Sequence, residues 1–438
     1  MTQPPLTGHI AVWGAGKSGI AAARLLAVHG HQVTLYDDQP TSTMVERLGH
    51  EPFAISGGGL SFESHSLIVL SPGIPPHSPS LKALFDASVP YLSEIELALR
   101  FTDAPVVAIT GTDGKSTTSA MIDHCLQAAG LKSILCGNFG IPVSDVVNTD
   151  EMIDVLVVEI SAFQLWSTQS FKPVVAIITN IANDHLDYFD GSFEDYQASK
   201  LRIFRDLTDG LVVLRHEEWL AHGDCVPAGT RVTHFDARVL DAHWRYTGEQ
   251  LMYDDTVIMS SQDLKVVGLH NINNALSAAA ALHHLKIADD VIAAGLKTFA
   301  GLPHRMEHVR EVDGVTFYND SKATNPHAAQ TGIDAMRGEQ IIIAGGYDKG
   351  LELSHFAEAL SRRKGCVLMG PAGRRLLELL PASESVVWVQ TMEEAVRTAF
   401  GMADQGDLVV LSPGSSSFDA FTSFEHRGDE FKRLVRLL

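Results

Sequence analysis

The chain has 438 residues, a formal net charge of −20 and 45% hydrophobic residues. This length exceeds what one hydrophobic core supports, so we expect two or three domains. The acidic balance without a basic stripe excludes nucleic acid as an expected partner, because phosphate backbones require clustered Lys and Arg side chains. No apolar stretch approaches the ~20 residues of a membrane span, and no signal-peptide pattern opens the chain, so a cytoplasmic location is expected.

The first 98 residues have the pattern of a nucleotide-binding α/β domain. A buried strand at 9–13 leads into GAGKSG at 14–19, a helix at 20–29 and a strand at 32–36 that ends at Asp37. This is a G-x-G-x-x-G turn followed by an acidic residue, as in folds that bind nucleotides or dinucleotides. Another strand at 66–70 ends in a loop with Gly73, which we expect beside the glycine loop at the carboxyl edge of the sheet.

A polar break at 101–105 predicts a domain boundary near residues 98–104, and the run VVAITGTDGKSTT follows it at 106–118. A strand, a glycine-bearing turn and a helix N-terminus form a phosphate cradle, in which Lys115 supplies charge and Ser116 or Thr117 a hydroxyl for Mg²⁺. The loop is shorter than the usual G-x-x-x-x-G-K-[ST] pattern, because Ile109 occupies its first glycine position. The phosphate-binding residues expected here are Gly111, Thr112, Asp113, Gly114, Lys115, Ser116 and Thr117.

Three further groups in the central region could take part in chemistry. Glu159 ends the apolar strand at 155–159, and the strand at 174–179 is followed by NIANDHLD, in which His185 lies between two acidic residues. Carboxylate and imidazole groups at strand ends are candidate Mg²⁺ or substrate ligands. Lys200 lies on an amphipathic helix, where it is either a surface lysine or a metal-supporting group if its amine is carbamylated. Residues 211–265 favour shorter strands, and 268–285 favour a helix.

The last 138 residues alternate strands and helices again. Polar loops follow the strands at 315–318, 340–344 and 408–411, with the sequences NDSKATN, GGYDKG and SPGSSSFD. If these loops lie at one sheet edge, they form a binding face. The four cysteines, Cys125, Cys136, Cys225 and Cys366, show no C-x-x-C spacing and are expected to be reduced core thiols.

Ten motifs in this order resemble the Mur ligases of bacterial cell-wall synthesis along essentially the whole chain. They are TGTDGKST, GNFG, EISAFQL, NDHLD, YQASKLRIF, HNINNALSA, GLPHRME, NDSKATNP, SPGSSSFDAF and TSFEHRGDEF. GLPHR with NDSKATN, and the C-terminal S-x-D-x-F-x-x-F-E-x-R-G pattern, resemble the glutamate-adding member. Asp113, Ala162 and the run Gly414-Ser415-Ser416 depart from the commonest family pattern, and the last departure leaves the enantiomer of glutamate open.

The resemblance implies three α/β domains: a UDP-binding Rossmann-like domain at 1–98, a mostly parallel P-loop ATPase-type domain at 99–300 and a Rossmann-like amino-acid-binding domain at 301–438. The UDP-linked substrate would meet Gly14, Ala15, Gly16, Lys17, Asp37, Gly73 and Asn138. ATP would also meet Asn271, Arg305, Asp320 and Lys322. Glutamate would meet Thr324, Lys349, Ser417, Phe418 and Phe424.

The implied activity is the ATP-dependent addition of D-glutamate to UDP-N-acetylmuramoyl-L-alanine through an acyl phosphate. Lys115, His185 and Lys200 would be catalytic, and Ser116, Glu159, His185 and carbamylated Lys200 would hold or support two Mg²⁺ ions. Both substrates are small molecules, and a monomer is expected.

Other readings remain open on sequence alone. The same ligase could use L-glutamate, or the chain could be an amino-acid ligase of the folylpolyglutamate or cyanophycin type. A nicotinamide- or flavin-dependent oxidoreductase would explain the first glycine loop but leaves the loop at 106–118 without a role. A binding protein without catalysis is a further alternative, which the many polar loops at the ends of strands make less favourable.

Overall fold

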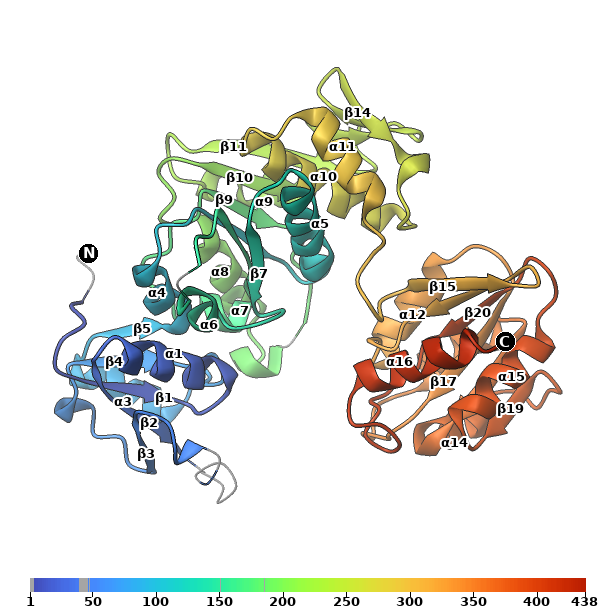
Figure 1. Ribbon diagram of the computed structural model, residues 1–438, viewed down its shortest axis with the longest axis horizontal. Helices are drawn as coiled ribbons and strands as arrows, with labels where there is room; N and C mark the ends of the chain where they lie inside the picture. Colours follow the sequence, from blue (N-terminus) through green and yellow to red (C-terminus); the bar gives the residue numbers. More distant parts are fainter. Residues whose placement is uncertain (1–3, 39–45, 47, 150, 185) are drawn as a thin grey trace. The chain divides into compact units, whose positions relative to one another are not determined.

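The computed structural model describes residues 4–38, 46, 48–149, 151–184 and 186–438 (Figure 1). The chain forms two compact units, one of residues 1–264 with 269–298 and one of residues 265–268 with 299–438. Within the described ranges, no helix combines the length and the apolar character needed to cross a membrane.

The first sheet of the first unit has five parallel strands in the order β3-β2-β1-β4-β5. The chain runs outward from β1 in one direction and resumes at β4 on the other side, so the loops after β1 and β4 flank the switch point where such sheets bind ligands. Its elements are β1 (His9–Trp13), α1 (Lys17–Val28), β2 (Gln32–Asp37), β3 (Ala54–Gly57), η1 (Phe62–Ser64), β4 (Leu67–Leu70), α3 (Pro79–Ala87), β5 (Tyr91–Ser93), α4 (Glu94–Ala98) and η2 (Leu99–Phe101).

The second sheet has nine strands in the order β14-β13-β12-β11-β10-β9-β6-β8-β7 and is antiparallel only at β12–β13 and β13–β14. The short strands predicted within 211–265 and the helix predicted at 268–285 are confirmed. The elements are β6 (Val106–Thr110), α5 (Lys115–Ala128), β7 (Ser133–Gly137), α6 (Val143–Val147), β8 (Val155–Glu159), α7 (Ala162–Leu165), β9 (Val175–Ile178), η3 (Leu186–Phe189), α8 (Phe193–Leu201), η4 (Arg202–Phe204), β10 (Leu211–Arg215), α9 (His216–His222), η5 (Gly223–Cys225), β11 (Arg231–Asp236), β12 (Trp244–Tyr246), β13 (Gln250–Tyr253), β14 (Thr256–Ser260), η6 (Ser261–Asp263), α10 (Leu269–His284) and α11 (Asp289–Thr298).

The second unit is a six-stranded sheet in the order β15-β16-β20-β17-β18-β19, and only β15 runs antiparallel to its neighbour. Apolar clusters cover both faces of this sheet. The elements are β15 (Glu307–Val312), β16 (Val315–Asn319), α12 (Pro326–Ala335), β17 (Gln340–Gly345), α13 (Ser354–Ser361), β18 (Gly365–Met369), α14 (Gly370–Leu379), β19 (Val386–Val389), α15 (Met392–Met402), β20 (Leu408–Leu411) and α16 (Phe424–Val435).

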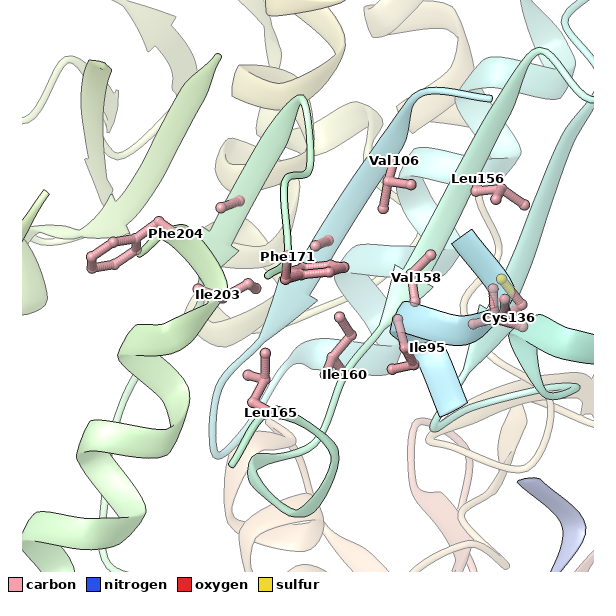
Figure 2. Packing of buried hydrophobic residues seen from close by; sticks show 14 of the residues in the cluster. Ile95, Val106, Cys136, Leu156, Val158, Ile160, Leu165, Phe171, Ile203 and Phe204 are labelled. Carbon is pink, nitrogen blue, oxygen red and sulfur yellow. The ribbon is translucent and has the colours of Figure 1, made fainter. Parts of the chain in front are cut away.

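The first two sheets share a hydrophobic core, which explains why the chain forms two units around three sheets. Leu25 of α1 and Ile95 of α4 belong to the same buried cluster as Val158 of β8 and Phe171. Figure 2 shows Ile95 beside Val158 in this cluster. The boundaries expected at 98/99 and 300/301 stay predictions.

Two buried carboxylates of α4 connect the part of the chain that forms the first sheet to the part that forms the second sheet. Glu96 accepts backbone hydrogen bonds from Gln169 at 2.7 Å and Ser170 at 2.6 Å, and Glu94 accepts one from Ser144 at 2.8 Å. Burial raises the pKa of Glu94 to about 7, and the hydrogen bond from the Ser144 N–H only partly opposes this effect.

The raised pKa of Glu94 gives a pH dependence with a definite sign. The folded state keeps this proton between pH ~4.5 and ~7 while the unfolded state loses it, so stability decreases as pH rises through this window. At pH 8 the free energy of unfolding is lower by on the order of 3 kcal/mol than below pH 4.5. We expect Glu94→Gln to flatten the fall in melting temperature between pH 5 and pH 8. The exposed Glu63→Gln is the control, and parallel profiles for Glu94→Gln and wild type would contradict the assignment.

The cysteine prediction is confirmed in part. Cys125, Cys136 and Cys366 are buried and unpaired, and burial raises the pKa of Cys125 to about 12. Cys225 is exposed, so its prediction as a core thiol is wrong. It lies in η5, a short surface turn after α9, which the residue spacing does not reveal.

Candidate functional site

The loops after β1 and β4, predicted to bind the UDP-linked substrate, lie together at the switch point of the first sheet. The backbone N–H of Ala15 donates to Asp37 at 3.0 Å, and the Ser71 hydroxyl donates to the carbonyl of Gly14 at 2.7 Å. Gly14 has φ +100°, and a Cβ at Gly19 would lie 1.9 Å from the Gly14 carbonyl oxygen. The first and last glycines of the motif are therefore required by the turn, whereas a Cβ at Gly16 or at Gly73 would meet nothing within 4 Å.

The loop that carries Gly73 is anchored by a residue that the sequence pattern did not single out. The Tyr188 hydroxyl donates toward the carbonyls of Pro72 and Ile74, each at 2.8 Å, and accepts from the Trp166 indole at 2.9 Å. Tyr188 follows the NDHLD motif by one residue. Its place next to this motif is the one sign of Tyr188 that the sequence offers. The loop that Tyr188 contacts lies 114–116 residues away in the chain, so the sequence does not reveal the contact.

The phosphate-binding loop has the conformation that its two glycines predict. Gly111 has φ +149° and a Cβ there would lie 1.8 Å from the Thr179 hydroxyl, while Gly114 has φ +80° and its Cβ would lie 2.4 Å from Asn274. Gly114 caps α5, so the helix N-terminus opens directly onto this loop. The N-terminal end of a helix dipole favours an anion at this position.

Two lysines converge on one carbonyl of this loop. Lys115 Nζ donates to the carbonyls of Gly111 and Thr112, each at 2.8 Å, and Lys200 Nζ donates to the Gly111 carbonyl at 2.6 Å. The side chain of Lys200 is 2% exposed and its Nζ lies 4.6 Å from the ring centre of Tyr196. Burial, followed by the nearby charge of Lys115, lowers the pKa of Lys200 well below its usual range. The alternative of a surface lysine at 200 is therefore wrong.

Thr112 connects the phosphate-binding loop to the segment that precedes His185. Its backbone N–H donates to the carbonyl of Asn180 at 2.9 Å, and its hydroxyl accepts from the N–H of Ala182 at 2.9 Å. The Thr112 hydroxyl also lies 3.0 Å from that of Tyr196. His185 itself lies outside the described residues, so its predicted role stays a prediction.

Glu159 has a carboxylate oxygen of the kind that binds a cation. It ends β8, where Ile109 of β6 is its register partner, so it lies beside the strand that leads into the phosphate-binding loop. Oε1 accepts from the Asn138 amide at 2.6 Å. Among the described residues, the buried Oε2 has no hydrogen-bond partner. A buried carboxylate oxygen without a donor is costly unless a cation binds it, so this oxygen fits Mg²⁺.

The described residues alone do not complete a metal site. No group of three or more His, Cys, Asp or Glu side chains among them is arranged to hold a metal. The predicted metal set draws on His185 and carbamylated Lys200 as well as Ser116 and Glu159. The partly buried Ser116 lies in the first turn of α5.

Helix α10 packs against the predicted phosphate-binding loop and α5 through Asn274. The Thr118 hydroxyl of α5 donates to Asn274 at 3.3 Å, and the Asn274 amide donates to Asn271 at 3.2 Å. Asn271, predicted to lie near the nucleotide, is thus brought to the helix that follows the loop.

In the second unit, the three predicted loops lie at one sheet edge. β16, β20 and β17 are adjacent and parallel, so the segments after Asn319, Leu411 and Gly345 leave the same edge. The binding face expected from the sequence is confirmed as an arrangement of backbone. The predicted residues that this unit contains are Arg305, Asp320, Lys322, Thr324, Lys349, Ser417, Phe418 and Phe424.

These side chains differ in how they are presented. Lys349 is exposed and Phe418 is 67% exposed, and their predicted role in binding glutamate stays a prediction. Asp320 is buried instead and accepts from the N–H of Met306 and the hydroxyl of Ser412, each at 3.2 Å. Burial raises the pKa of Asp320 to about 7. In this unit, Asp320 joins the loop after β20 to the segment before β15.

Three family models match the chain in the order of its sheets. They are the Mur ligase MurD-like N-terminal domain over residues 8–93, the Mur ligase middle domain over 109–282 and the Mur ligase glutamate ligase domain over 304–414. A UDP-N-acetylmuramoylalanine–D-glutamate ligase of Streptococcus pyogenes serotype M4 is 37% identical over 432 residues, which cover 96% of this chain and 95% of the relative. The chain belongs to the Mur ligase family. The resemblance stated from the motifs is confirmed.

Solved structures agree with the Mur ligase fold. The UDP-N-acetylmuramate–alanine ligase of Thermotoga maritima is similar with a TM-score of 0.61 at 18% identity, covering 98% of this chain and 99% of that one. The ligase that is named for adding D-alanyl-D-alanine in Acinetobacter baumannii also has a TM-score of 0.61, at 16% identity, covering 94% of this chain and 92% of that one. At these identities the likeness concerns the fold alone.

Proposed function

We propose that this Mur ligase joins D-glutamate to UDP-N-acetylmuramoyl-L-alanine at the expense of ATP, by way of an acyl phosphate. The observation that carries the proposal is the convergence of Lys115 and Lys200 on the Gly111 carbonyl, two residues after Ile109, the register partner of Glu159. This arrangement brings the charged Lys115 and the buried amine of Lys200 to the N-terminus of α5, where an ATP phosphate would lie. The name of the Streptococcus relative supplies the two substrates.

The chemistry assigned to this chain has two steps. The terminal carboxylate of the UDP-linked substrate attacks the γ-phosphate of ATP, and ADP leaves. The amine of glutamate then attacks the acyl carbon and phosphate leaves. Lys115 would offset the negative charge that gathers in the first step. Lys349 with the hydroxyls of Thr324 and Ser417 would bind the two carboxylates of glutamate.

We assign Mg²⁺ to the Oε2 edge of Glu159, with the hydroxyl of Ser116 and His185 as further ligands. Mg²⁺ supplies Lewis-acid neutralisation of phosphate charge when bound. Asn138 then has a role beyond the UDP-linked substrate, because its amide fixes the other oxygen of Glu159. Two ions, as the family resemblance implies, stay part of the proposal.

Carbamylation of Lys200 fits the environment of its amine. A neutral amine is the form that combines with carbon dioxide, and burial together with Lys115 favours that form. The product is an anion, which the ammonium group of Lys115 beside it would stabilise. Mass spectrometry of the intact protein under native conditions, with and without bicarbonate, tests for the added carboxylate.

The acceptor is tested by comparing kcat/KM for D-glutamate, L-glutamate and D-aspartate at saturating ATP and UDP-N-acetylmuramoyl-L-alanine. We expect D-glutamate to be preferred by several kcal/mol, because a site that binds both carboxylates leaves polar groups unpaired when the stereocentre inverts or the chain shortens. A preference for L-glutamate would overturn the D-specific assignment and keep the ligase. Phosphate release with folate and glutamate alone would favour the folylpolyglutamate alternative.

We also propose that the enzyme is a monomer, since one chain supplies all of the residues that we assign to the substrates and to Mg²⁺. Sedimentation at the enzyme concentration of the assay tests this point.

A further inference from the structure

A buried arginine in the second unit contacts two of its three functional loops. Arg427 lies in the first turn of α16 and is 2% exposed. Its Nε donates to the Ser321 hydroxyl at 2.9 Å and its Nη2 to the Ser321 carbonyl at 2.9 Å. Nη2 also donates to the Ser415 carbonyl at 3.0 Å, and Nη1 donates to the Ser416 carbonyl at 3.1 Å. The guanidinium therefore bridges the loop after β16 and the loop after β20.

The third loop is connected through the same contact. The carbonyl of Ser416 that accepts from Arg427 also accepts from the N–H of Tyr347 at 2.9 Å, two residues before Lys349. A Cβ at Gly346 would lie 2.5 Å from that carbonyl oxygen and 3.1 Å from Arg427 Nη1, so glycine is required for this approach. Arg427 thus lies at the junction of the three loops that carry the residues assigned to glutamate.

The partners of Arg427 are backbone carbonyls and one hydroxyl, and no carboxylate hydrogen-bonds to it among the described residues. A buried charge is costly, and hydrogen bonds in several directions are needed to offset that cost. The fixed fork of a guanidinium provides them, whereas a lysine would offer three donors from one nitrogen. These contacts fix the backbone on either side of the fork without using any side chain assigned to a substrate.

We propose that Arg427 is a positioning residue of the glutamate site, which holds the Ser415–Ser417 backbone in register with the loop that carries Lys322 and Thr324. This role rests on the proposed function. Ser417, the next residue after Ser416, is buried and follows the two carbonyls that Arg427 holds. Release of those carbonyls would displace the Ser417 hydroxyl and the neighbouring Phe418 from the sheet edge at which the loop of Lys349 also lies.

The test compares Michaelis constants for each substrate separately. We expect Arg427→Ala to raise the KM of D-glutamate at least about tenfold and to leave the KM of UDP-N-acetylmuramoyl-L-alanine within about twofold, because the predicted UDP contacts lie in the other unit. Guanidinium ion, added far below denaturing concentrations, is expected to lower the raised KM. Arg427→Lys keeps the charge without the fork, and we expect a smaller rise in the same constant.

The matched control is Arg433→Ala. Arg433 lies on the same helix, but its side chain is exposed and pairs with Glu430 at 2.7 Å, so no KM is expected to change. An equal change in the KM of both substrates, or a fall in kcat with the glutamate KM unaltered, would overturn the positioning role. If Arg427→Ala does not fold, Arg427→Lys decides, and an unchanged glutamate KM in that variant overturns the role.

The two proposals fail in different ways. A wild-type enzyme without activity toward D-glutamate counts against the proposed function. The same comparison of KM values, made with the amino acid that the enzyme does use, then decides the role of Arg427.

Discussion

Lys115→Ala is expected to lower kcat by about 10²- to 10³-fold, the loss that typically follows removal of one group that stabilises transition-state charge. Lys115 Nζ already lies over the loop, at 2.8 Å from the carbonyls of Gly111 and Thr112. A small rotation of its flexible chain would exchange these carbonyls for phosphate oxygens. The measurement is phosphate release from ATP at saturating UDP-N-acetylmuramoyl-L-alanine and D-glutamate.

Lys132→Ala is the matched control for this variant. Lys132 lies in the same unit, shortly after α5, and its exposed side chain pairs with Glu151 at 2.7 Å. Surface pairs of this kind contribute little, so wild-type turnover is expected. Turnover of Lys115→Ala within about threefold of wild type would remove the loop from the catalytic argument.

Sequence pattern predicted the parts of this protein in which local and global constraints agree. Strand Val106–Thr110 is buried along its whole length and apolar from 106 to 109, because parallel sheets bury both faces. The glycines at 111 and 114 adopt the positive φ that their turn requires. The lining of the phosphate-binding loop was visible for the same reason, since one short segment supplies the strand, the turn and the helix N-terminus.

The remaining contacts depend on residues that are distant in the chain. Tyr188 anchors Pro72, and Asn274 contacts the loop helix at Thr118, yet each occupies a helix or turn that gives no sign of its partner. Glu94 is a similar case. Its S-E-I-E context predicts an ordinary capped helix start, whereas its burial depends on the approach of α6, which no local pattern encodes. In the sequence, Arg427 is only one letter of a family pattern. Its four hydrogen bonds to Ser321, Ser415 and Ser416 depend on the fold and not on the local sequence.

Lys200→Ala is expected to be almost inactive, with a loss comparable to that of Lys115→Ala, because it removes the buried amine on which we propose the carbamate forms. The variant also loses the contact with the Gly111 carbonyl and the packing of Nζ over Tyr196. A melting curve therefore accompanies the assay, and a folded but inactive protein is the expected result.

A carboxylate supplied in solution distinguishes the carbamate from the bare amine. Acetate is small and carries the charge of the missing carbamate, so it is expected to restore part of the activity of Lys200→Ala. Bicarbonate is not expected to help, because no amine remains to be carbamylated. Lys115→Ala serves as the control, since its missing group is a cation that acetate cannot replace. Activity of Lys200→Ala without any additive would show that the amine is dispensable, and rescue of both variants alike would show that acetate acts elsewhere on the enzyme.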